Sequence, residues 1–197
     1  KLMADFIAPQ YEQFLKDNHL FCFDQLWSRK EEWFEPRNFG RSESGWSGVC
    51  RLDVGGKSFF LKRQENYFTL RLKYPFKISV AEDEFCNLAT YANCGVPSLD
   101  VVAFRVRVVD GKRQALIMTA ALDGYVDLDS VSNNLTGAPL SVQAKRRLMS
   151  QLAQLVRLAH SKGLFHGNLY PNHIFVDAAL AKGEASKLTI PCRFIDM

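Results

Sequence analysis

The chain has 197 residues, of which 47% are hydrophobic and 23% are charged, and its formal net charge at pH 7 is +4. This much apolar surface can offset the entropy lost on ordering the chain, which excludes wholesale disorder. The 12 glycines and 7 prolines follow no period, which excludes collagen-like structure. No run of about 18 apolar residues predicts a membrane span, and no N-terminal segment is typical of a signal peptide. The length suits one larger domain or two small lobes.

Positive charge is concentrated in residues 57–77, where six basic side chains accompany one acidic side chain. Such a block forms either a solvated face or a surface for phosphates and anionic headgroups. The net charge of +4 is too mild to indicate nucleic acid, so we expect no nucleic-acid partner. The five cysteines are odd in number and contain no C-x-x-C pair, which predicts reduced, mostly buried thiols in a cytosolic protein.

The N-terminal half is predicted to be mostly strands. Residues 9–30 carry apolar side chains at mixed helical spacing, which indicates short helices. Two alternating runs, 49–54 and 57–63, are joined by Gly55-Gly56 and predict a β-hairpin, because glycine accepts the positive φ of a tight turn. A helical stripe follows over 81–93. Strands over 101–109 and 114–119 are then separated by Asp110-Gly111, a second hairpin signal.

A helix leads the C-terminal half. Apolar side chains recur on one face between Ser141 and Ser161, Ser141 can cap the first turn, and Gly163 follows the end. Strands are predicted over 173–176 and 188–195. We therefore expect an α+β fold with a β-rich lobe over 1–120 and a helix-led lobe over 121–197.

Four features carry residue types suited to phosphate chemistry. The stretch 44–49 contains Gly45 and Gly48, which let backbone amides approach a phosphate or simply form a turn. Lys62 lies inside an apolar strand, where it either pairs with a carboxylate and a phosphate or blunts a sheet edge. Glu84, near the start of the helix over 81–93, is either a partner for Lys62 or a complement to the helix dipole. Glu82 and Asp83 are rivals for that role.

The fourth feature is the polar loop over 166–173, followed after an apolar strand by Asp196. His173 alone would be an ordinary loop or core histidine. A carboxylate at the end of the next strand makes a Mg²⁺ site credible, because Mg²⁺ is usually held by one or two carboxylates together with substrate phosphates.

In this order, the features resemble the protein-kinase-like fold and, within it, the bacterial lipopolysaccharide core kinases, in their InaA-like branch. The resemblance covers about residues 20–197. It is carried by residues 45–49, 61–67, Glu84, 95–97, 122–125, 166–176 and 195–196.

The resemblance implies a set of roles. Gly45, Trp46, Ser47 and Gly48 would lie in the loop that covers the phosphates of ATP. Lys62, held by Glu84, would orient the α- and β-phosphates, and residues from Met118 to Leu122 would form the adenine-side hinge. In the loop and the strand after it, His166 and Asn168 would be catalytic and Asp196 would bind Mg²⁺. His173 would either help to bind the ion or shape the loop. Catalysis in such a site is mostly positioning and charge neutralisation.

Three positions depart from the kinase pattern. Asn168 stands where active kinases have the catalytic aspartate, and an amide cannot accept the substrate proton as a carboxylate does. Phe60, two residues before Lys62, stands where a small residue usually admits adenine. The chain ends one residue past Asp196, so we expect either an incomplete chain or a minimal member of the family with a short C-lobe.

The resemblance therefore implies an ATP- and Mg²⁺-dependent transfer of phosphate to a hydroxyl of a lipopolysaccharide core sugar or another sugar. It implies a cytoplasmic protein in possible peripheral contact with the inner membrane through residues 57–77. The alternative is a pseudokinase that binds a nucleotide or a partner without chemistry, and Asn168 is its main support.

Overall fold

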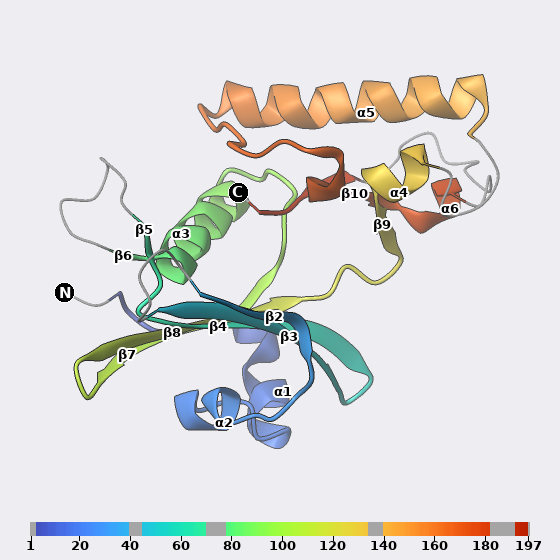
Figure 1. Ribbon diagram of the computed structural model, residues 1–197. Helices are drawn as coiled ribbons and strands as arrows, with labels where there is room; N and C mark the ends of the chain where they lie inside the picture. The colour runs from blue at the N-terminus through green and yellow to red at the C-terminus, as the bar shows by residue number, and fades with distance from the viewer. Residues whose placement is uncertain (1–2, 40–44, 70–77, 134–139, 182–191, 197) are drawn as a thin grey trace. The chain divides into compact units, whose positions relative to one another are not determined.

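A computed structural model of the chain describes residues 3–39, 45–69, 78–133, 140–181 and 192–196 (Figure 1). The chain divides into two compact units. The first contains residues 1–87 and 100–121, and the second contains residues 88–99 and 122–197. Helix α3 (Val80–Asn93) contributes residues to both units. Within the described residues, no helix is both long and apolar enough to cross a membrane.

The first unit is built on a six-stranded antiparallel sheet in the order β1-β7-β8-β4-β3-β2 (Figure 1). Its strands are β1 (Phe6–Ile7), β2 (Trp33–Phe39), β3 (Trp46–Val54), β4 (Lys57–Glu65), β7 (Val101–Val109) and β8 (Lys112–Ala120). A separate two-stranded pair joins β5 (Phe68–Thr69) to β6 (Ile78–Ser79).

Both predicted hairpins are confirmed. Gly55 and Gly56 have φ of 56° and 73°, and Asp110 and Gly111 have φ of 49° and 73°. Positive φ at both central residues defines the turn that matches the twist of the flanking strands. Strand β3 begins three residues earlier than predicted, at Trp46. Strand β2 was not predicted.

The two faces of this sheet have different partners. Short helices cover one face: η1 (Pro9–Tyr11), α1 (Glu12–Asp17) and α2 (Phe23–Trp27). These confirm the helices predicted over 9–30. Their leucines form a core with alternate residues of the sheet, and this core contains Leu15, Leu20, Leu26, Leu52, Phe59, Leu61, Leu116 and Met118. Helix α3 lies on the other face, where Phe85 stacks on Phe104 of β7 with ring centroids 4.4 Å apart.

Two arginines of the sheet bind the N-terminal helical segment that contains η1, α1 and α2. Arg63 donates to the carbonyl oxygens of Trp27 and Arg29, both at 2.7 Å. Arg107 pairs with Asp24 at 2.5 Å, and its guanidinium lies over the ring of Phe23. A buried guanidinium that satisfies two carbonyls is a charge-assisted contact of the stronger kind. The helical segment is therefore an integral part of the first unit.

The second unit contains the longest helix, α5 (Val142–Ser161). The Ser141 hydroxyl accepts a hydrogen bond from the Ala144 amide at 3.1 Å, and Leu148, Leu152, Leu155 and Ala159 are buried. The predicted helix, its cap and its apolar face are confirmed. The helix predicted over 81–93 is also confirmed, beginning one residue earlier at Val80.

A three-stranded sheet completes the second unit in the order β11-β10-β9: β9 (Tyr125–Asp127), β10 (Ile174–Asp177) and β11 (Cys192–Phe194). Short helices α4 (Leu128–Ser132), η2 (Pro171–His173) and α6 (Ala178–Ala181) flank these strands. His173 was predicted to begin a strand but ends η2, because Pro171 favours the first position of a helical turn. Of the strand predicted over 188–195, positions 188–191 lie outside the described residues.

None of the five cysteines forms a disulfide, but the prediction that most are buried is wrong. Only Cys50 and Cys192 are buried, and Cys22 is exposed. Burial raises the pKa of the Cys192 thiol to about 11.

Candidate functional site

An ion pair joins strand β4 to helix α3 in the first unit. The Nζ of Lys62 lies 2.5 Å from Oε2 of Glu84, and both side chains are largely buried. Glu82, a rival for this role, is fully buried against Arg113 and also accepts from the Ser79 amide at 2.9 Å. Because successive helical residues are rotated by about 100°, only one of the neighbouring acids can point at Lys62, and that residue is Glu84.

A hydrogen-bonded relay holds the start of α3 against the same strands. Gln64, two residues after Lys62, donates to the Ser47 hydroxyl at 3.0 Å and accepts from the Ala81 amide at 2.8 Å. The Ala81 amide is one of the first N–H groups of the helix, which have no partner within it. Gln64 therefore sets the position from which Glu84 reaches Lys62. Sequence reasoning missed Gln64, although its place on the same face as Lys62 was a usable signal.

Close packing explains why glycine occupies positions 45 and 48 of the expected phosphate-covering loop. A Cβ on Gly48 would lie 2.6 Å from the ring of Trp33, and a Cβ on Gly45 would clash with the carbonyl oxygen of Asn66. Trp46 packs against Trp33 with ring centroids 5.9 Å apart. Trp46, Ser47 and Gly48 belong to β3. Residues 40–44, which precede them, lie outside the described residues.

The expected hinge residue Met118 lies inside β8 and is fully buried in the core beneath the N-terminal helices. Its neighbour in register is Leu61, whereas Lys62 is opposite Ile117. Strand side chains alternate between faces, so Thr119 shares the face of Lys62 and Met118 does not. Strand β8 ends at Ala120, so the expected hinge over residues 118–122 begins inside this strand and continues beyond its end.

The second unit assembles the loop over 166–173. Nδ1 of His166 accepts from the Asn168 amide at 3.2 Å, so the ring proton resides on Nε2, which donates to the Ile195 carbonyl at 2.7 Å. Burial lowers the pKa of His166, which favours this neutral form. His166 therefore ties the loop to the residue before Asp196.

His173 holds the same loop from the other side. Its Nδ1 lies 2.7 Å from the Asn168 carbonyl, which can only accept, so Nδ1 carries a proton. Its Nε2 lies 3.5 Å from Oδ2 of Asp196. Asp196 is half exposed and has a φ of 55°, a left-handed conformation that is unusual for a side chain other than glycine. The structure thus brings His166, Asn168, His173 and Asp196 together.

The donors at this point suit a metal ion that arrives with phosphates. Among the described residues, no group of three or more His, Cys, Asp or Glu side chains could hold a metal by itself. One carboxylate, Asp196, and one imidazole nitrogen, on His173, face each other. Mg²⁺ commonly keeps only one or two protein carboxylates and takes its other ligands from phosphates and water. The Asp196 carboxylate therefore fits Mg²⁺ bound to a nucleotide, whereas the imidazole of His173 is a nitrogen donor of the kind that transition metals prefer.

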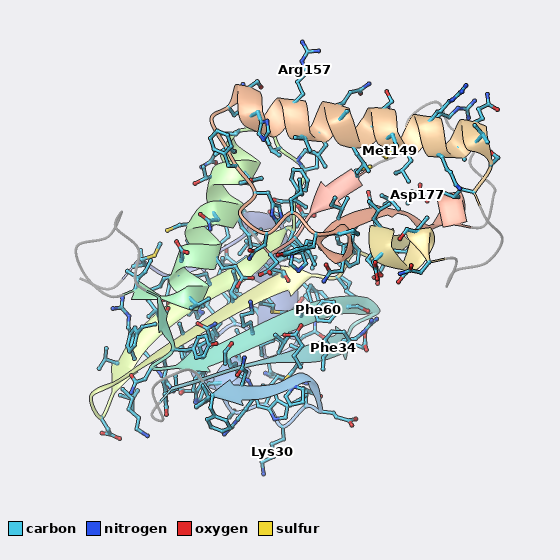
Figure 2. All side chains as sticks on the ribbon, turned by 45° about the horizontal axis from the view of Figure 1, so that its top comes forward. Lys30, Phe34, Phe60, Met149, Arg157 and Asp177 are labelled. Carbon is cyan, nitrogen blue, oxygen red and sulfur yellow. The ribbon has the colours of Figure 1, made fainter. Side chains whose placement is uncertain are left out.

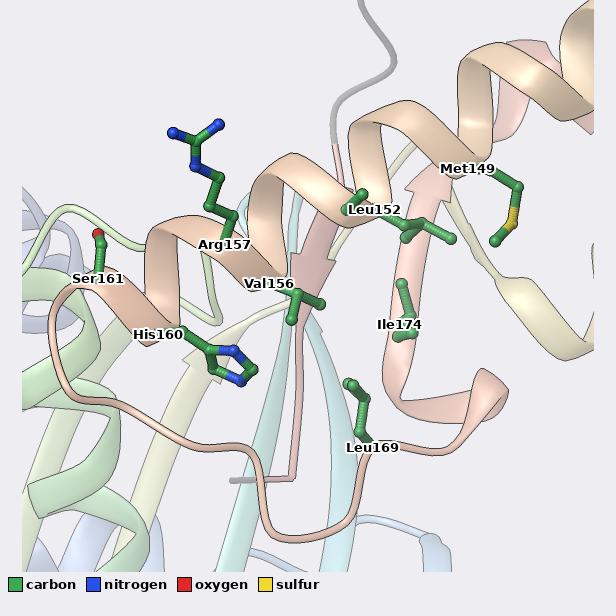
Figure 3. Close-up of a pocket in the computed structure, with 9 residues that line it drawn as sticks. Met149, Leu152, Val156, Arg157, His160, Ser161, Leu169 and Ile174 are labelled. Carbon is green, nitrogen blue, oxygen red and sulfur yellow. The ribbon is translucent and has the colours of Figure 1, made fainter.

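An apolar groove lies beside the loop in the second unit (Figure 3). It has a volume of about 780 Å³. One face of α5 lines it, including Met149, Val156 and His160, together with Leu169 of the loop and Ile174 of β10. The groove was not foreseen from the sequence, because its walls come from segments separated along the chain.

The lysine–glutamate pair on an antiparallel sheet and the histidine-fastened loop ahead of an aspartate place the chain in the protein-kinase-like class. Its fold is that of a solved structure described as "WaaP in complex with acyl carrier protein", with a TM-score of 0.69 and 18% sequence identity over 98% of this chain and 70% of that chain.

Residues 24–196 match the Lipopolysaccharide kinase (Kdo/WaaP) family, and the chain belongs to it. Two relatives from Escherichia coli are each 24% identical. "Protein InaA" of strain K12 matches 78% of this chain and 70% of its own length. "Lipopolysaccharide core heptose(I) kinase WaaP" matches 85% of this chain and 67% of its own length. The expected family and fold are confirmed.

Proposed function

We propose that the chain is an ATP-dependent phosphotransferase that moves the γ-phosphate of ATP to a hydroxyl of a lipopolysaccharide core sugar. Family membership supports a sugar kinase, and the observation that carries the proposal is the Lys62–Glu84 pair at 2.5 Å. The Glu84 carboxylate holds the partly buried Lys62 ammonium in one place on the sheet, and an ammonium held in this way is a suitable point charge for phosphate oxygens. An isolated lysine on an edge strand would need no such partner.

In this proposal each group has a positioning task. Lys62 orients the α- and β-phosphates, and Glu84 restrains Lys62. Asp196, with His173 beside it, would hold Mg²⁺, and the ion would supply positive charge that neutralises the phosphates. The sugar oxygen attacks the γ-phosphorus, the bond to the bridging oxygen breaks, and ADP leaves with the electron pair.

Asn168 orients the attacking hydroxyl in this scheme. Its carboxamide oxygen can accept a hydrogen bond from the hydroxyl but cannot take its proton at neutral pH. The proton then passes to a phosphoryl oxygen. Since general-base catalysis typically contributes about 10²–10⁴-fold, we expect slow transfer by this chain.

The test uses ATP labelled at the γ-phosphate and deacylated lipopolysaccharide core as the acceptor. We expect slow, Mg²⁺-dependent labelling that falls at least about 100-fold in Lys62→Ala, as when one charge-stabilising donor is removed. Lys112→Ala is the matched control, because Lys112 is an exposed lysine on the neighbouring strand β8, paired with Glu65. Equal labelling by the Lys62→Ala and Lys112→Ala variants would contradict the proposal.

A second candidate function is a pseudokinase that binds nucleotide without transferring phosphate, and Asn168 favours it. The Asn168 backbone is held by His166 and His173, so Asn168→Asp changes the side chain without removing either hydrogen bond. If the parent is inert and Asn168→Asp transfers phosphate, the pseudokinase is correct. Labelling by the parent rejects it.

We also propose that the acceptor is met at the cytoplasmic face of the inner membrane, through the basic block over 57–77. Arg71, Lys73 and Lys77 of this block lie outside the described residues. Anionic headgroups attract such segments by about 1 kcal/mol per basic side chain. Charge reversal at these three positions should release the protein from vesicles of anionic phospholipid, and unchanged binding would reject this placement.

A further inference from the structure

Two phenylalanines lie together on the face of the first unit's sheet that carries Lys62. Phe34 of β2 and Phe60 of β4 meet edge to face, with ring centroids 5.1 Å apart (Figure 2). Phe34 is 60% exposed and Phe60 is half-buried. Neither ring belongs to the core beneath the N-terminal helices, because that core lies on the opposite face of the sheet.

Phe60 lies at a fixed distance from Lys62, the candidate phosphate-binding residue. Phe60 precedes Lys62 by two residues, so the two Cα atoms are about 7 Å apart and the side chains leave the same face. The cross-strand neighbours of Phe60 are Arg51 and Thr119. The Arg51 guanidinium lies 6.0 Å from the centroid of the Phe60 ring. A planar ligand that reaches from Lys62 along β4 therefore meets the ring of Phe60 first.

Phe60 also changes which ligand group can pack against this part of β4. A small side chain opposite Thr119 would leave a slot in which a flat base could pack against the strand. The ring of Phe60 takes up that position instead, beside the ring of Phe34. Aromatic rings stack on nucleobases with little preference for the base, because every base has a π-face.

We propose that Phe60 and Phe34 form a stacking platform for the base of the nucleotide whose phosphates bind at Lys62. This inference rests on the proposed function and adds a property to it, which is tolerance of the base. ATP and GTP bind with affinities within about threefold of each other, because stacking on the platform makes no hydrogen bond to the edge of the base.

The test compares ATP, GTP and inorganic tripolyphosphate by calorimetry in the presence of Mg²⁺. Phe60→Ala weakens ATP binding about 5- to 150-fold, the loss of one base-stacking contact. Tripolyphosphate has no base, so its affinity is unchanged in Phe60→Ala and falls in Lys62→Ala. Phe60→Leu keeps most of the apolar volume and removes the ring, and it weakens ATP in the same direction.

Phe39→Ala is the matched control. Phe39 is a 66% exposed phenylalanine on the same strand as Phe34, and it pairs in register with Trp46, which lies on the opposite face from Lys62. Its removal leaves ATP affinity unchanged.

The outcomes separate this inference from the proposed function. ATP affinity that is unchanged in Phe60→Ala and Phe60→Leu but reduced in Lys62→Ala overturns the platform alone. A preference for ATP over GTP of more than about 30-fold also overturns it, because such discrimination requires hydrogen bonds to the base edge. Failure of both ATP and tripolyphosphate to bind the parent overturns the platform and the proposed function together.

Discussion

Gly48→Ala tests whether this glycine serves packing or phosphate binding. The added Cβ would lie 2.6 Å and 2.9 Å from two atoms of the Trp33 ring. That ring cannot easily move, because Trp46 packs edge-on against it and the Arg63 guanidinium lies over it at 4.7 Å. Overpacking of this kind costs about 1–3 kcal/mol.

The net loss of stability in Gly48→Ala is smaller than the cost of the steric clash alone. Alanine restricts the unfolded chain and recovers about 0.5–1 kcal/mol relative to glycine in a strand. We therefore expect Gly48→Ala to lower the free energy of unfolding by about 1–2 kcal/mol. Urea denaturation measures this as a lower midpoint with an unchanged slope.

A double-mutant cycle with Trp33→Leu identifies the cause. Once the ring is removed, Gly48→Ala should stabilise the protein by about 0.5–1 kcal/mol, so the sign of its effect reverses. The same destabilisation by Gly48→Ala in both backgrounds would refute the packing explanation. A loss of ATP binding with unchanged stability would favour the phosphate role instead.

Further predictions concern the core, the long helix and the thiols. Met118→Ala should lower the free energy of unfolding by about 2–5 kcal/mol in urea denaturation, because Met118 is fully buried. An effect below about 1 kcal/mol would show that the Met118 side chain lies outside the core. Ser141→Ala should cost about 1 kcal/mol by removing the hydrogen bond to the Ala144 amide, whereas Ser141→Asp should retain stability in the same assay. At pH 8, iodoacetamide followed by mass spectrometry should find Cys22 modified and Cys192 protected. The pKa of Cys192, about 11, keeps its thiol protonated, so early modification there would contradict its burial.

Local chemistry accounts for the elements that were predicted correctly. Gly55-Gly56 and Asp110-Gly111 require no distant contact to form their turns, and the apolar stripe of α5 is visible along one helix. Strand β2 escaped prediction because it is an edge strand in which every residue after Trp33 is exposed, and Pro36 interrupts its pattern. Its register with β3 shifts twice, which no alternation along the sequence reveals.

The site was predictable in its parts but not in its contacts. The order of Lys62, Glu84, the loop over 166–173 and Asp196 indicated the family. The sequence could not choose Glu84 over Glu82, because that choice depends on the rotation of α3 about its axis. Nor could it show that Gly48 faces Trp33, which lies on a neighbouring strand 15 residues earlier. Such choices are made by tertiary packing.

Titration of ATP by calorimetry, with and without Mg²⁺, tests the central claim most directly. We predict binding that depends on the metal and falls at least about tenfold, or 1.4 kcal/mol, in both Lys62→Ala and Asp196→Ala. Lys112→Ala should bind as the parent does. Absence of ATP binding by the parent, or equal binding by all four proteins, would contradict the assignment of a kinase-type nucleotide site.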